Sequence, residues 1–396
     1  MNMNEQMKES EESILHTYNR FPVVFEKGQG CYLYDSEGKE YLDFAAGIAV
    51  NSLGYHYPGY DEALKDQIDK LMHISNLYYN EPIIEAGAKL VKASKMSKAF
   101  FTNSGTEAIE GALKAAKKYA YVRDGHADYE IIAMNHSFHG RSIGALSVTG
   151  TAHYREPFEP LMGGVKFADF NDLESVKAQI TDKTCAIITE VVQGEGGIYP
   201  AKKEFLEGLR QICDEKDIML IFDEIQCGMG RTGYYFAWQA YGVQPDIMTS
   251  AKALGCGVPV GAFVLNEKAA KASLEPGDHG TTYGGNPFVC AAVSKVFDIY
   301  ENDKIIEHVQ EMTPYLEQKL DEIVAKHECA ATRRGMGFMQ GIVIQGRPVG
   351  EVVKAALAKG LLVISAGSDV LRIVPPLVIT KEHIDKMAAI LDECME

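Results

Sequence analysis

Asp246-Ile-Met-Thr-Ser-Ala-Lys-Ala-Leu-Gly255 is the stretch around which the rest of the chain can be organised. Ile247 and Met248 begin a short apolar run that predicts a buried strand, and Lys252 stands at its end. Burying an unpaired ammonium group is costly, so this lysine needs an explanation. It could reach solvent from the strand end. Alternatively, burial could lower its pKa so that it bonds covalently to an aldehyde cofactor.

Composition and charge exclude several classes of protein. The chain has 396 residues, 46% of them hydrophobic and 24% charged, which predicts a large core and two domains. Its net charge of −16 argues against nucleic-acid and anionic-membrane partners. Residues 1–13 lack the apolar core of a signal peptide, and no apolar run approaches a membrane span. Eight cysteines without a C-x-x-C pair predict reduced thiols in a cytoplasmic enzyme.

Apolar segments alternate with amphipathic ones through the middle of the chain. The predicted strands are 98–102, 131–134, 185–190, 218–222 and the run before Lys252. This alternation predicts an α/β fold with a mostly parallel central sheet covered by helices. Ligands bind such sheets outside the carboxyl ends of the strands. Thr102, Asp223 and Lys252 all stand at strand ends, so we expect them to share one edge.

The remaining segments suggest how the chain divides. Residues 1–45 read as an arm ending in a hairpin of strands 31–34 and 40–44, and apolar residues at helical spacing (Leu64, Ile68, Leu71, Met72) follow. Residues 46–295 form the predicted large domain, including a glycine-rich loop at 276–287. Residues 296–396 predict a smaller α+β domain that also packs with the arm. Its expected strands are 337–344, 361–365 and 371–374, and its closing helix is 381–395.

The turn Asn103-Ser-Gly-Thr-Glu107 leads from a strand into a helix with a buried stripe at Ile109, Ala112, Leu113, Ala116 and Ala120. Ser104 and Glu107 fit a capping box, which would make the turn a well-capped helix start and nothing more. The same turn also leaves free N–H groups at the positive end of the helix dipole. It is therefore a candidate phosphate site as well.

Five motifs together resemble the class III, ornithine-type aminotransferases over nearly the full length. They are Asn-Ser-Gly-Thr-Glu-Ala (103–108), Ser-Phe-His-Gly-Arg (137–141), Asp-Glu-Ile-Gln (223–226), Ser-Ala-Lys-Ala-Leu-Gly (250–255) and Thr-Tyr-Gly-Gly-Asn-Pro (282–287). Segments 47–54 and 75–82 resemble the acetylornithine subgroup. The resemblance implies a fold type I, aspartate aminotransferase-like enzyme that uses pyridoxal phosphate.

This resemblance also implies roles for individual residues. Lys252 would bond to the cofactor and then move the substrate's proton, and Asp223 would pair with the protonated ring nitrogen. The other implied cofactor contacts are Gln226 with the ring's phenolic oxygen, Phe138 and Ile225 on the two ring faces, and Gly105 and Thr106 with the phosphate. Thr282 would reach the phosphate of the neighbouring subunit, which implies a homodimer with shared active sites.

The resemblance assigns the substrate contacts to Arg141, Glu195, Arg372 and Thr281. Arg141 would bind the α-carboxylate of the acylated diamino acid, and Arg372 would bind the α-carboxylate of glutamate. Glu195 would neutralise Arg372 when the amino donor is bound. Thr281 stands where a serine is common, Cys256 where a glycine is usual and Tyr55 where a histidine is common.

The implied activity is transfer of the terminal amino group of N2-acetylornithine to 2-oxoglutarate, in arginine biosynthesis. Succinylornithine, ornithine and 4-aminobutyrate are alternative donors. An aminomutase, a decarboxylase and a non-catalytic binding protein on the same fold are further alternatives. A nucleotide-binding dehydrogenase fits poorly because residues 255–261 miss the G-x-G-x-x-G spacing. A metal site fits poorly because His136 and His139 have no further ligand at suitable spacing.

Overall fold

A seven-stranded sheet forms the centre of the computed structural model, which describes residues 2–396. Its strand order is β4-β12-β11-β10-β7-β5-β6. The contacts from β11 through β10, β7 and β5 to β6 are parallel, whereas β12 runs antiparallel to both of its neighbours. The predicted α/β class with a mostly parallel sheet is confirmed. The strands are β4 (Lys98–Thr102), β5 (Glu130–Met134), β6 (Val165–Ala168), β7 (Thr184–Glu190), β10 (Met219–Asp223), β11 (Ile247–Ser250) and β12 (Gly261–Leu265).

The central strands are apolar at consecutive positions because both faces of the sheet are covered. In β10, Leu220 packs into the larger hydrophobic cluster and Ile221 into the smaller one. In β11, Met248 packs into the larger cluster and Ile247 into the smaller one. Successive side chains of a strand point to opposite faces, so two buried faces require an unbroken apolar run.

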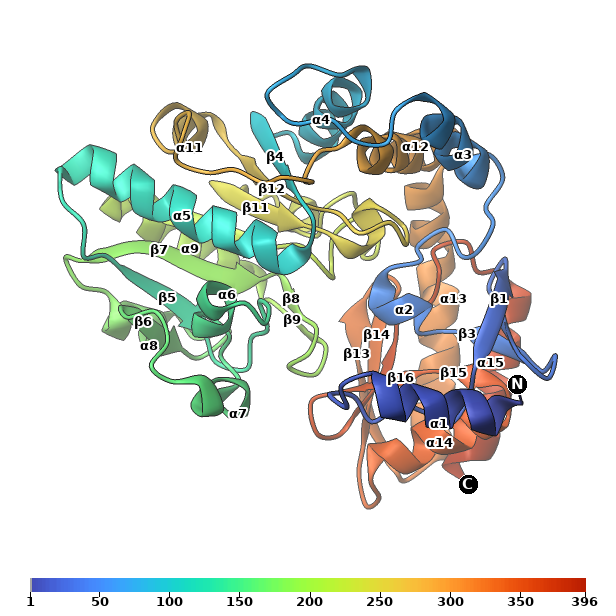
Figure 1. Cartoon of the computed structure of the whole chain (residues 1–396). Helices are drawn as coiled ribbons and strands as arrows, with labels where there is room; N and C mark the ends of the chain where they lie inside the picture. The colour runs from blue at the N-terminus through green and yellow to red at the C-terminus, as the bar shows by residue number, and fades with distance from the viewer. Residues whose placement is uncertain (1) are drawn as a thin grey trace.

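Helices lie on both faces of this sheet (Figure 1). Helix α5 (Gly105–Asp124) covers one face with the predicted stripe, and all five stripe residues are buried. Helix α9 (Lys203–Lys216) packs Phe205, Leu206 and Leu209 against the other face. The remaining helices up to residue 302 are α3 (Tyr60–Lys70), α4 (Glu81–Ser94), α6 (Ile143–Ser147), α7 (Ala152–Arg155), η1 (Glu156–Phe158), α8 (Leu173–Gln179), α10 (Trp238–Tyr241), η2 (Lys252–Leu254), α11 (Glu267–Lys271) and α12 (Pro287–Asn302).

The C-terminal residues build a separate antiparallel sheet of order β13-β14-β17-β16. These strands are β13 (Ala330–Met336), β14 (Met339–Ile344), β16 (Ile364–Ala366) and β17 (Val370–Ile373), and the helices are α13 (Ile305–Lys326), α14 (Val349–Ala358) and α15 (Lys381–Met395). A short hairpin of β8 (Val192–Gln193) and β9 (Tyr199–Pro200) lies between β7 and α9 in the sequence. The closing helix agrees with its predicted position.

The N-terminal residues form a third sheet with a strand from near the C-terminus. Its order is β1 (Phe25–Gln29), β2 (Tyr32–Asp35), β3 (Glu40–Asp43) and β15 (Leu361–Leu362). The predicted hairpin is therefore present. The predicted single strand 361–365 is wrong, because the chain leaves β3 after Leu362 and pairs with β17 from Ile364 onward. Helix α1 (Met3–Ser13) has no buried residue and was not predicted.

A left-handed turn, α2 (Ala46–Ala49), follows the N-terminal sheet. Ala46, Ile48 and Ala49 have φ of 47°, 63° and 62°, which is rare for residues other than glycine. The N–H groups of Ala45 and Ala46 donate to Asp43 Oδ1 at 2.9 and 2.8 Å. This turn leads directly to Val50 at the edge of the cavity described below.

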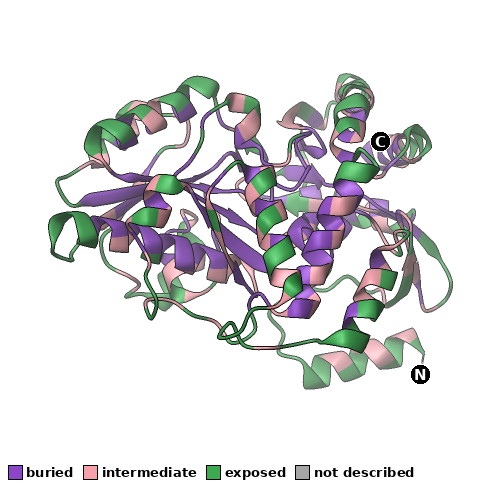
Figure 2. Cartoon of the chain, turned by 90° about the horizontal axis from the view of Figure 1, so that it is seen from above, coloured by how far each residue is buried: buried purple, intermediate pink, exposed green. Residues whose placement is uncertain are grey.

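Several apolar side chains lie on the surface. Ile68, Leu71 and Met72 are exposed, so the helical spacing seen at this place in the sequence does not mark a face buried within the chain. Figure 2 shows the central strands buried and the outward sides of the helices exposed. No helix within residues 2–396 combines the length and apolar character needed to cross a bilayer.

Candidate active site

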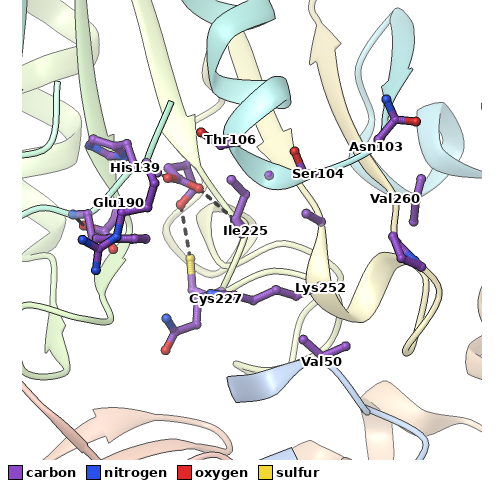
Figure 3. A pocket seen from close by; sticks show the side chains of 18 of the residues that line it. Val50, Asn103, Ser104, Thr106, His139, Glu190, Ile225, Cys227, Lys252 and Val260 are labelled. Carbon is purple, nitrogen blue, oxygen red and sulfur yellow. Dashed lines mark hydrogen bonds and ion pairs between the residues drawn. The ribbon is translucent and has the colours of Figure 1, made fainter. Parts of the chain in front are cut away.

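A cavity of about 500 Å³ opens at the carboxyl edge of the central sheet, a usual size for a small-molecule site. Figure 3 shows Lys252, Ile225 and Thr106 around it, with His139 and Glu190 together at one side. The cavity is lined by Val50, Asn103, Ser104, Gly105, Thr106, Phe138, His139, Gly140, Arg141, Glu190, Val192, Asp223, Ile225, Gln226, Cys227, Ala251, Lys252, Gly257, Val258, Pro259 and Val260. Segments far apart in the sequence therefore meet at this edge, as the strand pattern predicts.

Lys252 lies just beyond β11 and begins the short helix η2. Its φ of 50° is in the left-handed region, which a non-glycine residue adopts at an energetic cost. Its side chain is half-buried because it faces the cavity. Burial lowers the pKa of the Lys252 amine, and Arg372 lowers it further against the opposing effect of Glu195. A lowered pKa increases the fraction of unprotonated, nucleophilic amine at neutral pH.

Asp223 is the last residue of β10 and is buried. Its Oδ1 accepts hydrogen bonds from the Ile225 N–H at 3.0 Å and the Thr249 hydroxyl at 3.2 Å. Its Oδ2 lies 2.8 Å from His139 Nδ1. The carboxylate therefore has a fixed orientation at the cavity wall.

The start of helix α5 contributes backbone donors to the cavity. The Ser104 side chain accepts from the Glu107 N–H at 3.3 Å, as a helix cap should. The predicted capping box is wrong in its second half, because Glu107 Oε2 accepts from the Asn103 N–H at 2.8 Å instead of from Ser104. Helix geometry leaves the N–H groups of Gly105 and Thr106 without intrahelical acceptors. They are available to an anion at the positive end of the helix dipole.

Two glycines keep the cavity wall close to this helix start. A Cβ on Gly105 would lie 2.9 Å from Ile225 Cδ1. A Cβ on Gly140, whose φ is 141°, would lie 2.4 Å from Thr106 Oγ1. Both positions thus favour glycine because the side chains of Ile225 and Thr106 pack directly against the glycine backbone.

Arg141 lies at the exposed mouth of the cavity. Its guanidinium group stacks 4.1 Å from the centre of the Tyr154 ring and 5.4 Å from that of Phe138. Within residues 2–396 it forms no ion pair. A guanidinium held by aromatic rings and left without an anion is suited to bind a carboxylate of a ligand.

Arg372 and Glu195 form the second charged feature of the site. Arg372 lies on β17 and is buried, and its Nη1 donates to Glu195 Oε1 at 2.5 Å and to Gln226 Oε1 at 3.2 Å. Although burial opposes ionisation, Arg372 lowers the pKa of Glu195 below its ordinary value. The structure thus brings the predicted pair together, and Gln226 connects it to the cavity.

Thr281 and Thr282 stand apart from the other predicted site residues. Thr281 Oγ1 accepts from Asn103 Nδ2 at 3.2 Å, so it lies behind the cavity wall. Thr282 is exposed and does not line the cavity of its own chain. All the remaining predicted cofactor-binding residues line the cavity.

Comparison with known proteins identifies the family. The model of the family "Aminotransferase class-III" matches residues 14–395. This chain is a class-III aminotransferase. It is 47% identical over 388 residues to the acetylornithine aminotransferase of Clostridium acetobutylicum, covering 98% of this chain and 100% of that one. It is 44% identical to the succinylornithine transaminase of Yersinia pseudotuberculosis, covering 94% of this chain and 92% of that one.

A solved structure agrees with the family assignment. The ornithine aminotransferase of Toxoplasma gondii matches this aminotransferase with a TM-score of 0.95 and 28% identity, covering 100% of this chain and 95% of that one. The predicted fold type, family and enzyme class are therefore confirmed. The aminotransferase depends on pyridoxal phosphate, as its family does.

The residues at the cavity fit this cofactor. Its phosphate matches the free N–H groups at the start of α5, and its aldehyde matches the amine of Lys252 with its lowered pKa. Its protonated ring nitrogen matches the buried carboxylate of Asp223. The flat faces of its ring match the side chains of Phe138 and Ile225 at the wall. The aminotransferase thus has one suitable group for each part of the cofactor.

Contacts of several groups near the cavity were not predicted from the sequence. His139 contacts Asp223, and Tyr154 stacks on Arg141. Glu190 is buried, and burial raises its pKa to about 7. Nothing in the spacing of these residues indicates such contacts, although Glu190, like Asp223, stands at the end of a predicted strand.

Two of the three departures from the family pattern, Cys256 and Tyr55, make hydrogen bonds close to the site. Cys256 is buried and accepts a hydrogen bond from the Leu53 N–H at 3.3 Å, and burial raises the pKa of its thiol. A buried thiol with a raised pKa is poorly reactive. The Tyr55 hydroxyl donates to Asp43 Oδ2 at 2.8 Å, which supports the segment before the left-handed turn.

Proposed function

We propose that the enzyme transfers the δ-amino group of N2-acetylornithine to 2-oxoglutarate, giving N-acetylglutamate semialdehyde and glutamate. The main support is the pair of arginines at the site. Arg141 has no anionic partner among the described residues, and Arg372 is paired with Glu195. One free and one masked guanidinium suit an enzyme whose two amino donors differ in the number of carboxylates near the reacting carbon. The activity would place the enzyme in arginine biosynthesis, in agreement with the names of its relatives.

Pyridoxal phosphate, when bound, supplies an electron sink for the negative charge that develops when a C–H bond next to the reacting nitrogen breaks. The chain supplies the groups around it. The N–H groups of Gly105 and Thr106 would hold the phosphate, and Phe138 and Ile225 would confine the ring. Gln226 would contact the phenolic oxygen, and Asp223 would keep the ring nitrogen protonated.

Lys252 is the proposed base of the reaction. Its amine would hold the cofactor in the resting enzyme, and when free it would be placed at the cavity to accept and return the proton of the substrate carbon. The lowered pKa of Lys252 favours the unprotonated amine that both steps need. Arg141 orients the acetylated donor through its α-carboxylate, which places the δ-carbon at the Lys252 side of the cavity.

Glu195 is the proposed switch between the two amino donors. With acetylornithine bound it neutralises Arg372, and with glutamate bound it gives way to the substrate α-carboxylate. Leaving the buried Arg372 unpaired would cost about 3–5 kcal/mol, so exchange of one anion for another avoids that cost. Thr281 would contact the substrate only indirectly, through Asn103.

Replacing Glu195 by alanine should favour glutamate over acetylornithine. In this variant, bound glutamate still supplies a carboxylate to Arg372, whereas bound acetylornithine leaves Arg372 unpaired. We therefore expect the ratio of the two kcat/KM values to shift about 100-fold towards glutamate. The measurement is the rate of each half-reaction followed by cofactor absorbance. Glu204→Ala, an exposed change on α9, is the control. Equal loss with both donors would argue against a switch.

Succinylornithine is the second candidate donor, because the chain also resembles a succinylornithine transaminase. A cavity of about 810 Å³ adjoins the site at Tyr154, on which Arg141 stacks, and at Glu195. Its lining includes Asp169 and Asp369 as well as Glu195, and no lysine or arginine. These three carboxylates would repel a second carboxylate on the acyl group, which favours the acetyl donor.

The enzyme is proposed to act as a homodimer in which Thr282 reaches the phosphate of the other subunit. The segment 77–84 and Tyr283 carry exposed apolar side chains, with Leu77 86% and Tyr79 96% exposed. The two segments lie side by side, because Asn76 Nδ2 donates to the Gly284 carbonyl at 2.8 Å. An apolar patch of this kind beside the site is suited to a second copy of the chain.

We expect light scattering of the purified enzyme to give twice the chain mass of 43.6 kDa. Tyr79→Asp should weaken the dimer because it buries a charge in the proposed interface. Lys354→Asp, an exposed change on α14, is the control. If the purified enzyme is a monomer and binds the cofactor with full affinity, the proposal that two subunits share the phosphate site is wrong.

The domain division and the location in the cell also remain proposals. We propose an arm at 1–45, a large cofactor-binding domain at 46–295 and a small domain at 296–396. This division is supported by the separate sheets, and it makes Arg372 and Glu195 a contact between the two domains. The eight free thiols, seven of them buried, suit a reducing compartment such as the cytoplasm.

The proposed function is tested by adding one amino donor at a time to the purified holoenzyme. N-acetylornithine should convert the cofactor to its amine form fastest, and 2-oxoglutarate should restore it with release of glutamate. Succinylornithine, ornithine and 4-aminobutyrate are the comparison donors. If one of them reacts more efficiently than N-acetylornithine, the donor assignment is wrong while the family assignment stands.

A further inference from the structure

His139 is a buried histidine whose ring contacts the candidate catalytic carboxylate. It lies in the loop after β5, with none of its side chain exposed. Its Nδ1 is 2.8 Å from Asp223 Oδ2. Because an ionised carboxylate only accepts hydrogen bonds, Nδ1 carries the proton and donates it to Oδ2. The contact thus fixes which ring nitrogen of His139 is protonated.

The rest of the surroundings hold this geometry in place. The His139 backbone N–H donates to Thr149 Oγ1 at 3.0 Å. The other ring nitrogen, Nε2, is buried and has no hydrogen-bond partner within the described chain, so no other residue competes for the ring orientation. On the far side of the carboxylate, Ile225 and Thr249 both donate to Oδ1. Asp223 is therefore held from two directions and leaves part of Oδ2 for a further donor.

Glu190 is a second buried acid that lines the cavity, and its charge interacts with that of Asp223. Its Oε2 accepts from the Phe138 N–H at 3.2 Å and its Oε1 from the Gly194 N–H at 3.1 Å. Burial raises the pKa of Glu190 to about 7, and the charge of Asp223 contributes to the increase. Both oxygens of Glu190 are thus occupied by backbone donors, and the carboxylate that contacts His139 is that of Asp223.

We infer that His139 is a positioning residue that holds the Asp223 carboxylate, through donation from Nδ1, in the orientation that keeps the cofactor's ring nitrogen protonated. The inference rests on the proposed role of Asp223 and adds a residue that acts only through it. A buried hydrogen bond to an ionised group is among the stronger ones in proteins. Its loss should weaken both the orientation of Asp223 and its hold on the ring nitrogen.

Three substitutions separate this role from a purely structural one. In His139→Asn the side-chain amide can still donate from near the position of Nδ1. In His139→Phe the ring volume is kept and the donor is lost. His126→Phe is the matched control, because the same change is made at an exposed histidine outside the cavity. The measurements are the dissociation constant of pyridoxal phosphate and the nitrogen-15 chemical shift of its labelled ring nitrogen in the holoenzyme.

We expect His139→Phe to raise the cofactor dissociation constant about 10- to 100-fold, the equivalent of one charged hydrogen bond. Its ring nitrogen signal should move towards that of unprotonated pyridine. His139→Asn should retain most of the parent's signal, and His126→Phe should retain all of it. If His139→Phe keeps the parent's nitrogen signal, or if both His139 variants change it equally, the inference is overturned.

The same measurement on Asp223→Ala distinguishes a failure of the role of His139 from a failure of the role of Asp223. Asp223→Ala should remove ring-nitrogen protonation outright. If Asp223→Ala leaves the signal unchanged, the assignment of Asp223 itself fails. If it changes the signal while His139→Phe does not, only the role of His139 fails. Neither result depends on which amino donor the enzyme uses.

Discussion

Replacing Lys252 by alanine is expected to lower transamination by at least about 10⁴-fold. In the proposed mechanism the amine would serve both as the covalent attachment for the cofactor and as the base that moves the substrate's proton. Positioned acid–base groups alone contribute about 10²–10⁴-fold, and loss of the covalent attachment adds to that. The measurement is single-turnover conversion of the bound cofactor by N-acetylornithine.

The variant should still fold and bind the cofactor, because the N–H groups at the start of α5 and the Asp223 carboxylate remain. Its absorbance should be that of free, unattached aldehyde. Lys354→Ala, on the exposed side of α14, is the matched control. A Lys252→Ala enzyme within tenfold of the parent rate would mean that another group is the base.

Replacing Asp223 by alanine is expected to lower the rate by about 10²–10⁴-fold. Removing one partner of a buried ion pair costs about 3–5 kcal/mol, and here the partner is the ring nitrogen whose positive charge makes the cofactor an electron sink. The rate to measure is again that of the half-reaction with N-acetylornithine. Asp182→Ala, in an exposed loop, is the control.

A cofactor methylated at the ring nitrogen offers a direct check of this explanation. Its positive charge is permanent, so it needs no carboxylate to keep it. It should restore a substantial part of the rate in Asp223→Ala and bring none of that benefit to Lys252→Ala. Failure of any rescue would indicate that Asp223 acts through structure and not through charge.

The parts of the fold that could be predicted are those in which the local pattern of apolar residues matches the burial of the element within the chain. Strands β10 and β11 are continuous apolar runs because two hydrophobic clusters cover them. Helix α5 was predictable for the complementary reason, since its buried residues recur at helical spacing. In these elements local sequence and tertiary burial agree.

The parts that could not be predicted depend on contacts between distant segments. The split of 361–365 into β15 and β16 follows from pairing with β3 and β17, and a short apolar run does not reveal its partners. The left-handed turn at α2 is stabilised by Asp43 Oδ1, which accepts two backbone hydrogen bonds. The residues of the turn itself do not indicate this contact. The exposed positions of Ile68, Leu71 and Met72 show that an apolar residue at helical spacing need not be buried within its own chain.

The candidate site also has parts that could be predicted from the sequence and parts that could not. Lys252, Asp223 and the turn at 103–107 could be placed at one edge because strand ends of a parallel sheet share an edge. The pairing of Arg372 with Glu195 was inferred from resemblance alone, since 177 positions separate the two residues. The hydrogen bond from His139 to Asp223 and the stacking of Tyr154 on Arg141 required the structure, because side-chain orientation decides both.

The central claim is that the amine of Lys252 holds the cofactor. The most direct measurement is to reduce the holoenzyme with borohydride, digest it and locate the cofactor by mass spectrometry. We predict that the added mass lies on the peptide containing Lys252, at that residue, with about one cofactor per chain. Cofactor attached to a different lysine, or a holoenzyme from which reduction fixes none, would contradict the claim.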